Sequence, residues 1–399
     1  MRTRLAAVIV AAVVSVAITA QGRPRARDLG IAPGAGESGT LNAITDVAGV
    51  RVGHVTLAVG DRVRTGVTAI VPHGGNLFRE KVPGAVFVGN AFGKLAGSTQ
   101  VEELGTIETP IVLTNTLSVG AALDGLARWT VAQPGNDNVR SVNGLVGETN
   151  DGTLSDIRGF HVTAEHVAQA ISGAKEGAVA EGAVGAGTGT IAFGWKGGIG
   201  TSSRKSGNWM VGVLVQTNFG GRLTIAGVPV WRELRPGTTG DDRLRQVTTG
   251  SRNAQTPVLL PVVTGRNQSL PVVTESADGS CMIVVATDAP LDARDLKRLA
   301  ARAVFALART GSTYSNGSGD FAIAFSTNAA NRLTDTNGPQ PRSILPTDAV
   351  SGLFEAVLDA TEEAVYNSLL QAVTTTANGR TVRALPVDEL RAVLKKYGR

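Results

Sequence analysis

Cysteine, aromatic residues and clustered charge are all scarce in this 399-residue chain. The single cysteine, Cys281, excludes an internal disulfide, and its place in an apolar run indicates a small buried side chain. Aromatic residues make up only 4% of the chain and no basic run is interleaved with them, which argues against nucleic-acid binding. Of the four histidines, His161 and His166 stand five apart, without a Cys pair or an acidic cluster beside them. We therefore expect no metal site and no nucleic-acid partner.

Long apolar runs are also missing, except at the start of the chain. Arg2 and Arg4 precede an uncharged apolar stretch at 5–17, and Ala20 supplies a small residue at a candidate cleavage point. This pattern is typical of a signal peptide, and the stretch is short for a membrane span. We expect residues 1–20 to be removed on export, which leaves a periplasmic or secreted protein that is not attached to the membrane. An uncleaved anchor is the alternative.

Glycine, by contrast, is abundant. The 50 glycines are neither periodic nor confined to a linker, so they indicate tight turns and close backbone approaches rather than collagen or disorder. The glycine-rich stretch 185–200 lacks the Gly-Lys-Ser/Thr ending of a phosphate-binding loop, which favours backbone packing over nucleotide binding. An apolar content of 42% is enough for a large core, in one domain or in two tightly joined ones.

The spacing of apolar residues predicts strands and helices that alternate along the chain. The predicted strands are residues 47–55, 66–71, 84–88, 111–114, 190–193, 210–216, 223–225, 281–287 and 321–326. The predicted helices are residues 115–128, 163–175, 292–309, 347–373 and 387–397. This mixture indicates layered α/β packing, and the pattern alone takes the fold no further.

One Gly-Ser pair, Gly279-Ser280, stands between a polar segment and an apolar strand. Residues 235–278 are rich in Arg, Asp, Gly, Thr and Asn, and predict an exposed loop. Residues 281–286 form a continuous apolar run, which is typical of a strand covered on both faces. A self-cleaving N-terminal nucleophile hydrolase needs this layout, because cleavage before Ser280 would free both a hydroxyl nucleophile and an α-amine that can act as its base.

Gly-Ser pairs also occur at 97–98, 250–251, 311–312 and 317–318. Three of these serines lead into polar sequence, and the fourth, Ser318, precedes the apolar run 321–325 only after a glycine-rich turn. Ser280 is therefore the one serine of this kind that we predict to stand directly at the start of a strand.

A set of motifs shares its order along the chain with one known family. The motifs are Arg-Asp-Leu-Gly-Ile at 27–31, Asn-Ala-Ile-Thr-Asp-Val at 42–47, Gly-Val-Arg-Val-Gly-His at 49–54, Gly-Ala-Gly-Thr-Gly at 185–189, Phe-Gly-Trp-Lys-Gly-Gly-Ile-Gly-Thr at 193–201, Gln-Thr-Asn-Phe-Gly at 216–220, Gly-Ser at 279–280, Ala-Thr-Asp-Ala-Pro-Leu at 286–291, Gly-Ser-Gly-Asp at 317–320 and Glu-Glu-Ala-Val-Tyr-Asn-Ser-Leu at 362–369. Together they resemble the L-aminopeptidase/D-esterase (DmpA-type) and β-peptidyl aminopeptidase family of self-processing N-terminal nucleophile hydrolases.

The resemblance implies a four-layer αββα sandwich with the topology that this family shares with ornithine acetyltransferases. It also implies self-cleavage into an α chain, 21–279, and a β chain, 280–399, which stay together and assemble into a homo-oligomer. Members of the family release N-terminal residues from small peptides, amides and esters that carry a free N-terminal amine. No cofactor is expected.

The same resemblance assigns catalytic roles to individual residues. Ser280 matches the nucleophile and Asn218 the oxyanion donor, a role that suits a neutral amide. Ser318 and Asp320 match the element that orients the nucleophile, although some members carry Glu in place of Asp320. From pattern alone, Asn218 is an amide in a turn and Asp320 a turn residue before a strand.

Two residues match the part of the family's site that binds substrate. Glu148 corresponds to the carboxylate that holds the substrate's ammonium, because a buried ammonium is costly without a partner. Asn150 stands where the resemblance implies Tyr, so the shape of the pocket and the preferred substrate are expected to differ. From pattern alone, Glu148 is a solvated carboxylate in a loop.

Two other functions compete with an exported serine aminopeptidase or amidase. The first is acyl transfer to an amine acceptor on the same fold, but the ornithine acetyltransferases use Thr inside the cell, whereas this chain has Ser280 and an export signal. The second is a non-catalytic exported protein that binds amines. The retained Ser280, Asn218, Ser318 and Asp320 argue against it.

Overall fold

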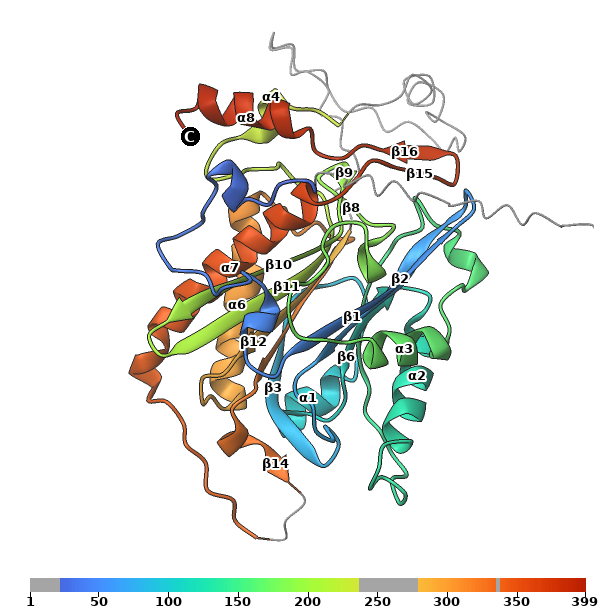
Figure 1. Cartoon of the computed structure of the whole chain (residues 1–399), viewed down its shortest axis with the longest axis vertical. Helices are drawn as coiled ribbons and strands as arrows, with labels where there is room; N and C mark the ends of the chain where they lie inside the picture. The colour runs from blue at the N-terminus through green and yellow to red at the C-terminus, as the bar shows by residue number, and fades with distance from the viewer. Residues whose placement is uncertain (1–21, 237–278, 335–337) are drawn as a thin grey trace, which may run out of the picture.

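A computed structural model of the protein describes residues 22–236, 279–334 and 338–399. In this part of the chain two sheets pack face to face, and a pair of helices covers the outer face of each sheet (Figure 1). The predicted signal segment 1–20 lies outside the described residues, as does nearly all of the predicted processing loop 235–278. No helix in the described ranges is long and apolar enough to cross a membrane.

The larger sheet has seven strands, and its centre is the strand that begins at Ser280. Its order is β10-β11-β12-β13-β3-β14, with β5 also paired to β3. The β12–β13 pair is parallel and the other pairs are antiparallel. The strands are β10 (Ile199–Ser206), β11 (Trp209–Asn218), β12 (Ser280–Thr287), β13 (Gly319–Ser326), β3 (Glu80–Ala91), β14 (Leu333–Thr334) and β5 (Thr106–Ile107).

The smaller sheet has five strands, in the order β1-β2-β6-β7-β4. Its strands are β1 (Arg51–Val59), β2 (Val63–Val71), β6 (Ile111–Asn115), β7 (Leu145–Thr149) and β4 (Leu95–Ala96). Helices α2 (Val119–Val131) and α3 (Ala164–Ser172) lie on its outer face, while α6 (Ala293–Thr310) and α7 (Ser351–Leu370) cover the larger sheet (Figure 1). The layers confirm the predicted αββα sandwich.

The alternation of side chains along β12 explains its continuous apolar run. Cys281 and Ile283 join the core that includes the inward faces of α6 and α7. Met282 and Val284 join the core between the two sheets. Every residue of β12 is buried, because helices cover one face of the strand and the second sheet covers the other.

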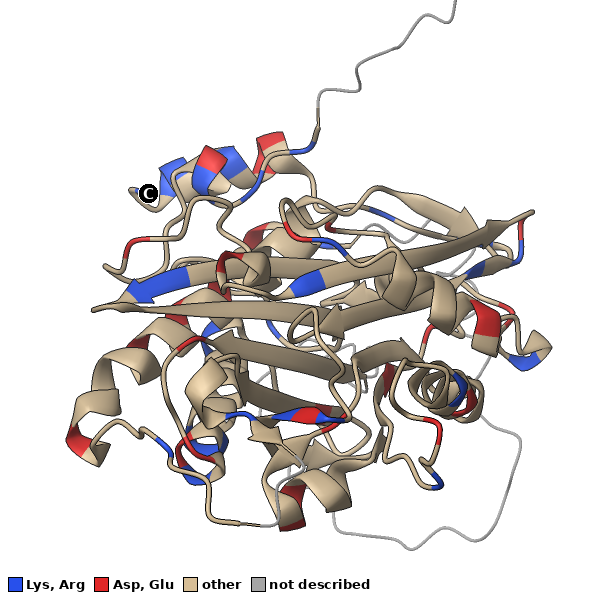
Figure 2. Ribbon diagram, turned by 60° about the horizontal axis from the view of Figure 1, so that its bottom comes forward, with Lys and Arg blue, Asp and Glu red and all other residues tan. Residues whose placement is uncertain are grey.

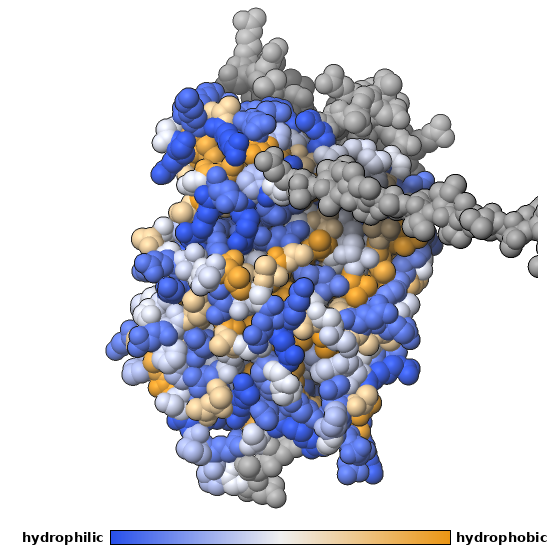
Figure 3. Space-filling model, viewed as in Figure 1, coloured by the Kyte–Doolittle hydropathy of each residue, from blue (hydrophilic) through white to orange (hydrophobic). Residues whose placement is uncertain are grey.

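The remaining elements are short or lie at the periphery. They are α1 (Ser98–Leu104), α4 (Val230–Glu233), α8 (Val387–Lys396), β8 (Ile191–Ala192), β9 (Trp195–Lys196), β15 (Thr375–Ala377), β16 (Arg380–Val382), and the 3-10 turns η1 (Arg27–Leu29), η2 (Ile44–Asp46), η3 (Ile157–Gly159), η4 (Gly185–Gly187), η5 (Ala329–Asn331) and η6 (Thr347–Val350). Charges of both signs are dispersed over the outer helices and strand ends (Figure 2). On the face shown in Figure 3, apolar residues form small scattered groups.

Most predicted elements are present, and those after Ser280 match most closely. Three predictions were wrong. The strand predicted at 47–55 begins only at Arg51, because η2 precedes it. The helix predicted at 115–128 begins at Val119, because Asn115 ends β6 and its Oδ1 accepts the N–H groups of the following turn. Residues 223–225 form no strand, and Ile225 makes only an isolated bridge.

Candidate active site

The start of β12 brings the predicted nucleophile beside the ends of two other strands. Ser280 stands opposite Asn218 of the antiparallel β11 and beside Gly319 of the parallel β13. The carbonyl oxygen of Gly279 accepts the N–H of Gly319 at 2.9 Å. Ser280 and Asn218 are 6% and 8% exposed. The sheet therefore holds both the serine and the peptide bond before it in a defined place that is still reached by solvent.

Gly279 fits this position because it has no side chain. An ideal Cβ at residue 279 would lie 2.1 Å from the carbonyl oxygen of Asn218 and 2.7 Å from the Cα of Phe219. Both contacts are too short for any other residue without movement of the backbone. The close approach of β11 therefore explains why the residue before the predicted scissile bond is glycine.

Asn218 is oriented by its own side-chain oxygen. Its Oδ1 accepts the backbone N–H of Ile191 at 3.0 Å, which leaves Nδ2 as the end of the amide that can donate. The residue is the last of β11 rather than part of a turn. An oriented amide donor on the residue paired with the serine is an arrangement suited to stabilising an oxyanion.

Ser318 and Asp320 form a buried pair at the start of β13. The Ser318 hydroxyl donates to Oδ2 of Asp320 at 2.8 Å. Burial raises the pKa of Asp320 to about 6, while the Ser318 hydroxyl and the backbone of Cys281 oppose the rise. Because β13 already begins at Gly319, Asp320 lies within the strand and Ser318 stands directly before it. β13 thus begins two residues earlier than predicted, but among the Gly-Ser serines in the described residues Ser280 alone is itself the first residue of a strand.

Glu148 reaches the same region from the other sheet. It lies in β7, is 2% exposed, and its Oε1 accepts from both the backbone N–H and the Nζ of Lys94, at 3.0 and 3.2 Å. An ideal Cβ at Gly93 would lie 3.2 Å from this Oε1 and 3.6 Å from the Cα of Gly319, the strand neighbour of Ser280. Glu148 is therefore a buried strand residue, and the alternative of a solvated loop carboxylate was wrong.

Asn150 is exposed in the turn after β7. Its Oδ1 accepts the N–H of Gly152 at 2.9 Å, so the oxygen serves the local turn. Among the described residues, no hydrogen bond joins Asn150 to Ser280 or Asn218. Asn150 therefore lies on the molecular surface, two residues after Glu148. Its effect on substrate preference stays a prediction.

The sequence profile described as "Peptidase family S58" matches residues 42–382. The chain belongs to this family. It is 43% identical to "Beta-peptidyl aminopeptidase BapA" of Sphingosinicella microcystinivorans, over 98% of this chain and 97% of that protein. Membership of the S58 family and the similarity to this β-peptidyl aminopeptidase identify the protein as a serine aminopeptidase, which is a hydrolase. They also confirm the family resemblance of the sequence motifs.

Two solved structures share the S58 architecture. L-aminopeptidase D-Ala-esterase/amidase from Ochrobactrum anthropi superposes with a TM-score of 0.80 at 36% identity, covering 94% of this chain and 99% of that one. It is described as a new variant among the Ntn hydrolase fold. The Burkholderia sp. β-aminopeptidase gives a TM-score of 0.78 at 37% identity, with the same coverage. The fold is therefore that of the DmpA-type Ntn hydrolases.

A buried lysine beside the S58 site was missed in the sequence. Lys196 is 0% exposed, and its Nζ donates to the carbonyl oxygens of Gly187 and Gly197 at 3.0 and 2.8 Å. Burial lowers the pKa of Lys196 to about 7 and raises the pKa of the neighbouring Asp151 to about 7. The only signal was a lysine within a glycine-rich stretch, which gives no indication of burial.

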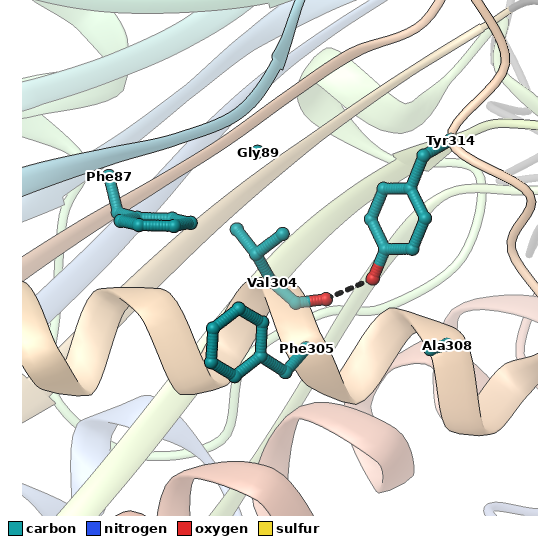
Figure 4. Close-up of a pocket in the computed structure, with 6 residues that line it drawn as sticks. All are labelled: Phe87, Gly89, Val304, Phe305, Ala308 and Tyr314. Atoms are coloured by element: carbon teal, nitrogen blue, oxygen red, sulfur yellow. Dashed lines mark hydrogen bonds between the residues drawn. The ribbon is translucent and has the colours of Figure 1, made fainter.

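An apolar cavity of about 320 Å³ lies between β3 and α6 (Figure 4). Its lining residues are Phe87, Gly89, Val304, Phe305, Ala308 and Tyr314. The Tyr314 hydroxyl donates to the carbonyl oxygen of Val304, and burial raises the pKa of this phenol. None of the lining residues is a predicted site residue, but the cavity lies near Asp320: a Cβ at Gly89 would lie 3.3 Å from the carbonyl oxygen of Asp320, and the Asp320 carboxylate acts electrostatically on Tyr314.

Proposed function

We propose that this protein is an exported aminopeptidase that cleaves itself before Ser280 and then works through an acyl-enzyme on that residue. The observation that carries the proposal is the position of Ser280. It starts a fully buried strand, stands opposite an oriented amide on β11, and lies beside the strand that carries the Ser318–Asp320 pair. A nucleophile, a donor for the oxyanion and a polar support for the new α-amine thus meet at one sheet end.

Cleavage of the Gly279–Ser280 bond would give Ser280 its own base. The free α-amine has an ordinary pKa of about 8, so near neutral pH a useful fraction can accept the hydroxyl proton, directly or through water. Because the Ser318 hydroxyl donates to Asp320, its oxygen lone pairs remain to accept an N–H from that amine. The pair would therefore hold the amine with its own lone pair toward the Ser280 hydroxyl.

The reaction then follows the usual two steps of acyl transfer. Ser280 Oγ attacks the carbonyl carbon of the substrate, and Asn218 Nδ2 donates to the oxygen that becomes negative. The bond to the leaving amine or alcohol breaks as the leaving group takes the proton from the α-amine. Water then attacks the ester on Ser280 as the α-amine takes one of its protons, and the resulting α-ammonium gives that proton to Ser280 Oγ as the bond to the acyl group breaks and the acid is released.

Glu148 is the group that would select substrates with a free N-terminal amine. Its carboxylate is almost fully buried, so it would bind an ammonium in a site with little competing water. Oε1 is held by Lys94, which fixes the plane of the carboxylate and leaves Oε2 for the substrate. We propose small peptides, amides and esters as substrates, in keeping with the β-peptidyl aminopeptidase and esterase/amidase names of the relatives.

The sheet pairing supports the proposal that the two cleaved chains stay together. Strands β11 and β3 would belong to the α chain, 21–279, whereas β12 and β13 would belong to the β chain, 280–399. Strands β12 and β13 thus lie between β11 and β3 of the α chain in one hydrogen-bonded sheet, and β14 of the β chain pairs with the other side of β3. The proposal also includes removal of residues 1–20 on export and assembly of the αβ units into a homo-oligomer.

Replacement of Ser280 by Ala tests the proposal. We expect the wild-type protein to give two chains by denaturing mass spectrometry, the second beginning at Ser280, and the variant to remain uncut and inactive toward an aminoacyl anilide. Ser98→Ala, which alters another Gly-Ser pair at the start of α1, is the matched control and should be cut and active. An uncut Ser280→Ala protein with full activity would disprove the proposed nucleophile.

A further inference from the structure

Lys196 carries an ionisable amino group in a place where charge is costly. It is 0% exposed, its Nζ is bound by two carbonyl oxygens, and within the described part of the chain it forms no ion pair. Asp151, itself 1% exposed and close to the side chains of Thr65 and Asn115, is the acidic residue that acts on it electrostatically. An apolar side chain of similar length would avoid this cost, so the ammonium is expected to do something that methylene groups cannot.

The two carbonyls that Lys196 binds flank the β8–β9 hairpin. Gly187 precedes this hairpin and Gly197 follows it, and Gly197 N–H also donates to Thr190 at 3.1 Å. Ile191 stands opposite Lys196 in the hairpin, and its N–H is the group that donates to Asn218 Oδ1. One ammonium therefore ties together both ends of the segment that orients the proposed oxyanion donor.

Close backbone contacts also restrict the movement of the β8–β9 hairpin. An ideal Cβ at Gly197 would lie 2.7 Å from the carbonyl oxygen of Thr217, and one at Gly187 would lie 2.5 Å from the N of Ile199. At the tip, Phe193 takes a left-handed φ of 53°, and its N–H donates to Phe219, the residue after Asn218, at 2.8 Å. The β8–β9 hairpin therefore packs closely against the end of β11. Its left-handed residue, Phe193, has a backbone conformation that persists only when surrounding contacts stabilise it.

We infer that Lys196 is a positioning residue for the chemical step: its buried ammonium holds the β8–β9 hairpin so that Ile191 N–H fixes the Asn218 amide toward the developing oxyanion. This inference rests on the proposed function, which makes Asn218 the oxyanion donor. It assigns no proton transfer to Lys196, and it predicts an effect on kcat rather than on the binding of the substrate's ammonium at Glu148.

A double-mutant cycle tests the inference. Lys196→Met keeps the length of the side chain and removes the ammonium, and Asn218→Ala removes the donor. The assay uses an aminoacyl anilide substrate, and rates are expressed per processed chain. We expect Lys196→Met to lower kcat about 10- to 100-fold, which does not exceed the loss that follows removal of a whole oxyanion donor. The same variant should change KM less than about threefold. In the Asn218→Ala background the same substitution should change kcat less than about twofold, because the amide it positions is gone.

Lys205→Met, on an exposed position of β10, is the matched control and should leave kcat unchanged. Full multiplication of the two effects in the double variant, or a raised KM with normal kcat, would overturn the positioning role. If Lys196→Met does not fold, Ile191→Pro removes the donor to Asn218 and leaves Lys196 in place, and a normal kcat there would also overturn it. An inactive wild type, or an Asn218→Ala variant with normal kcat, would instead disprove the proposed function on which the inference rests.

Discussion

The two halves of the site are built differently. At the ends of β11, β12 and β13, each polar group is buried and its backbone is fixed by strand register, with Asn218 and Asp320 held by further buried contacts. At the end of β7, Glu148 is buried, but its partner Lys94 has a side chain that is 52% exposed, and Asn150 is exposed. The first half has almost no freedom, whereas the second half combines the buried Glu148 with Lys94 and Asn150, which lie outside the strands and are more exposed.

This difference indicates how proteins with this fold could keep the same acyl-transfer reaction while their substrate preference changes. Residues of the fixed half would act on the acyl-transfer step, so their substitution should lower kcat. Residues of the surface half would act on the recognition of the N-terminal residue, so their substitution should alter KM or the ratio between substrates. Three predictions test this division, in order of decreasing effect.

Glu148→Gln should have the largest effect outside the nucleophile and oxyanion groups. The neutral amide cannot form the charged hydrogen bond to the substrate's ammonium, so we expect kcat/KM to fall about 10- to 100-fold, mainly through KM. Steady-state kinetics with an aminoacyl anilide and with its N-formyl analogue measure the effect. The N-formyl compound carries no ammonium and should lose little. Equal losses for both compounds would mean that Glu148 belongs with the fixed half.

The pH dependence of self-cleavage should follow Asp320. Burial raises the pKa of this carboxyl to about 6, so below pH 6 it becomes protonated and no longer offers an anionic acceptor to Ser318. We expect the rate of self-cleavage to fall about tenfold per pH unit below that value. Asp320→Asn should be slow at every pH and should not show this dependence. Rates are read from the appearance of the chain that begins at Ser280.

A stability control separates this effect from acid unfolding. Because the pKa of Asp320 is raised, the folded state binds the proton more tightly than the unfolded state between about pH 4 and 6. The free energy of unfolding of wild type, relative to Asp320→Asn, should therefore increase as the pH falls through this window, while the rate of self-cleavage decreases. A parallel fall of both quantities would assign the acid limb to unfolding.

The sequence predicted the fixed half better than the surface half, for a physical reason. The apolar run after Ser280 predicts β12 because both of its faces are buried, and the order of the motifs predicts the residues that meet there. Glu148 lies in β7, which the pattern did not predict because Gly147 interrupts its apolar residues, at a position where a Cβ would clash with Met282. Its role came from the family resemblance alone.

Lys196 shows a second limit of the sequence. Lysine is normally exposed, so a pattern of apolar residues cannot predict one that is buried against two carbonyl oxygens. One of these oxygens belongs to the adjacent Gly197, but the other belongs to Gly187, which precedes the hairpin and is brought to the lysine only by the fold. Such a group is found only when the backbone that surrounds it is known.

Asn150→Tyr should have the smallest effect and should change selectivity alone. The position is exposed beside the proposed ammonium site, so an added ring would alter the space for the N-terminal side chain without reaching Ser280. We expect the ratio of kcat/KM values for β-alanyl and L-leucyl anilides to shift by less than about tenfold, the range of small changes in apolar contact. Self-cleavage should keep its wild-type rate.

Asn150→Ala provides the matched control, because it loses the same bond to Gly152 N–H without adding a ring. That loss should cost about 0.5–1.5 kcal/mol of folding stability in both variants, which thermal unfolding would register as similar small decreases in Tm. A shift in selectivity that occurs only with Tyr would assign the effect to the ring. A large fall in kcat with either variant would show that the turn after β7 supports the acyl-transfer step, and the division between a fixed and a replaceable half would not hold.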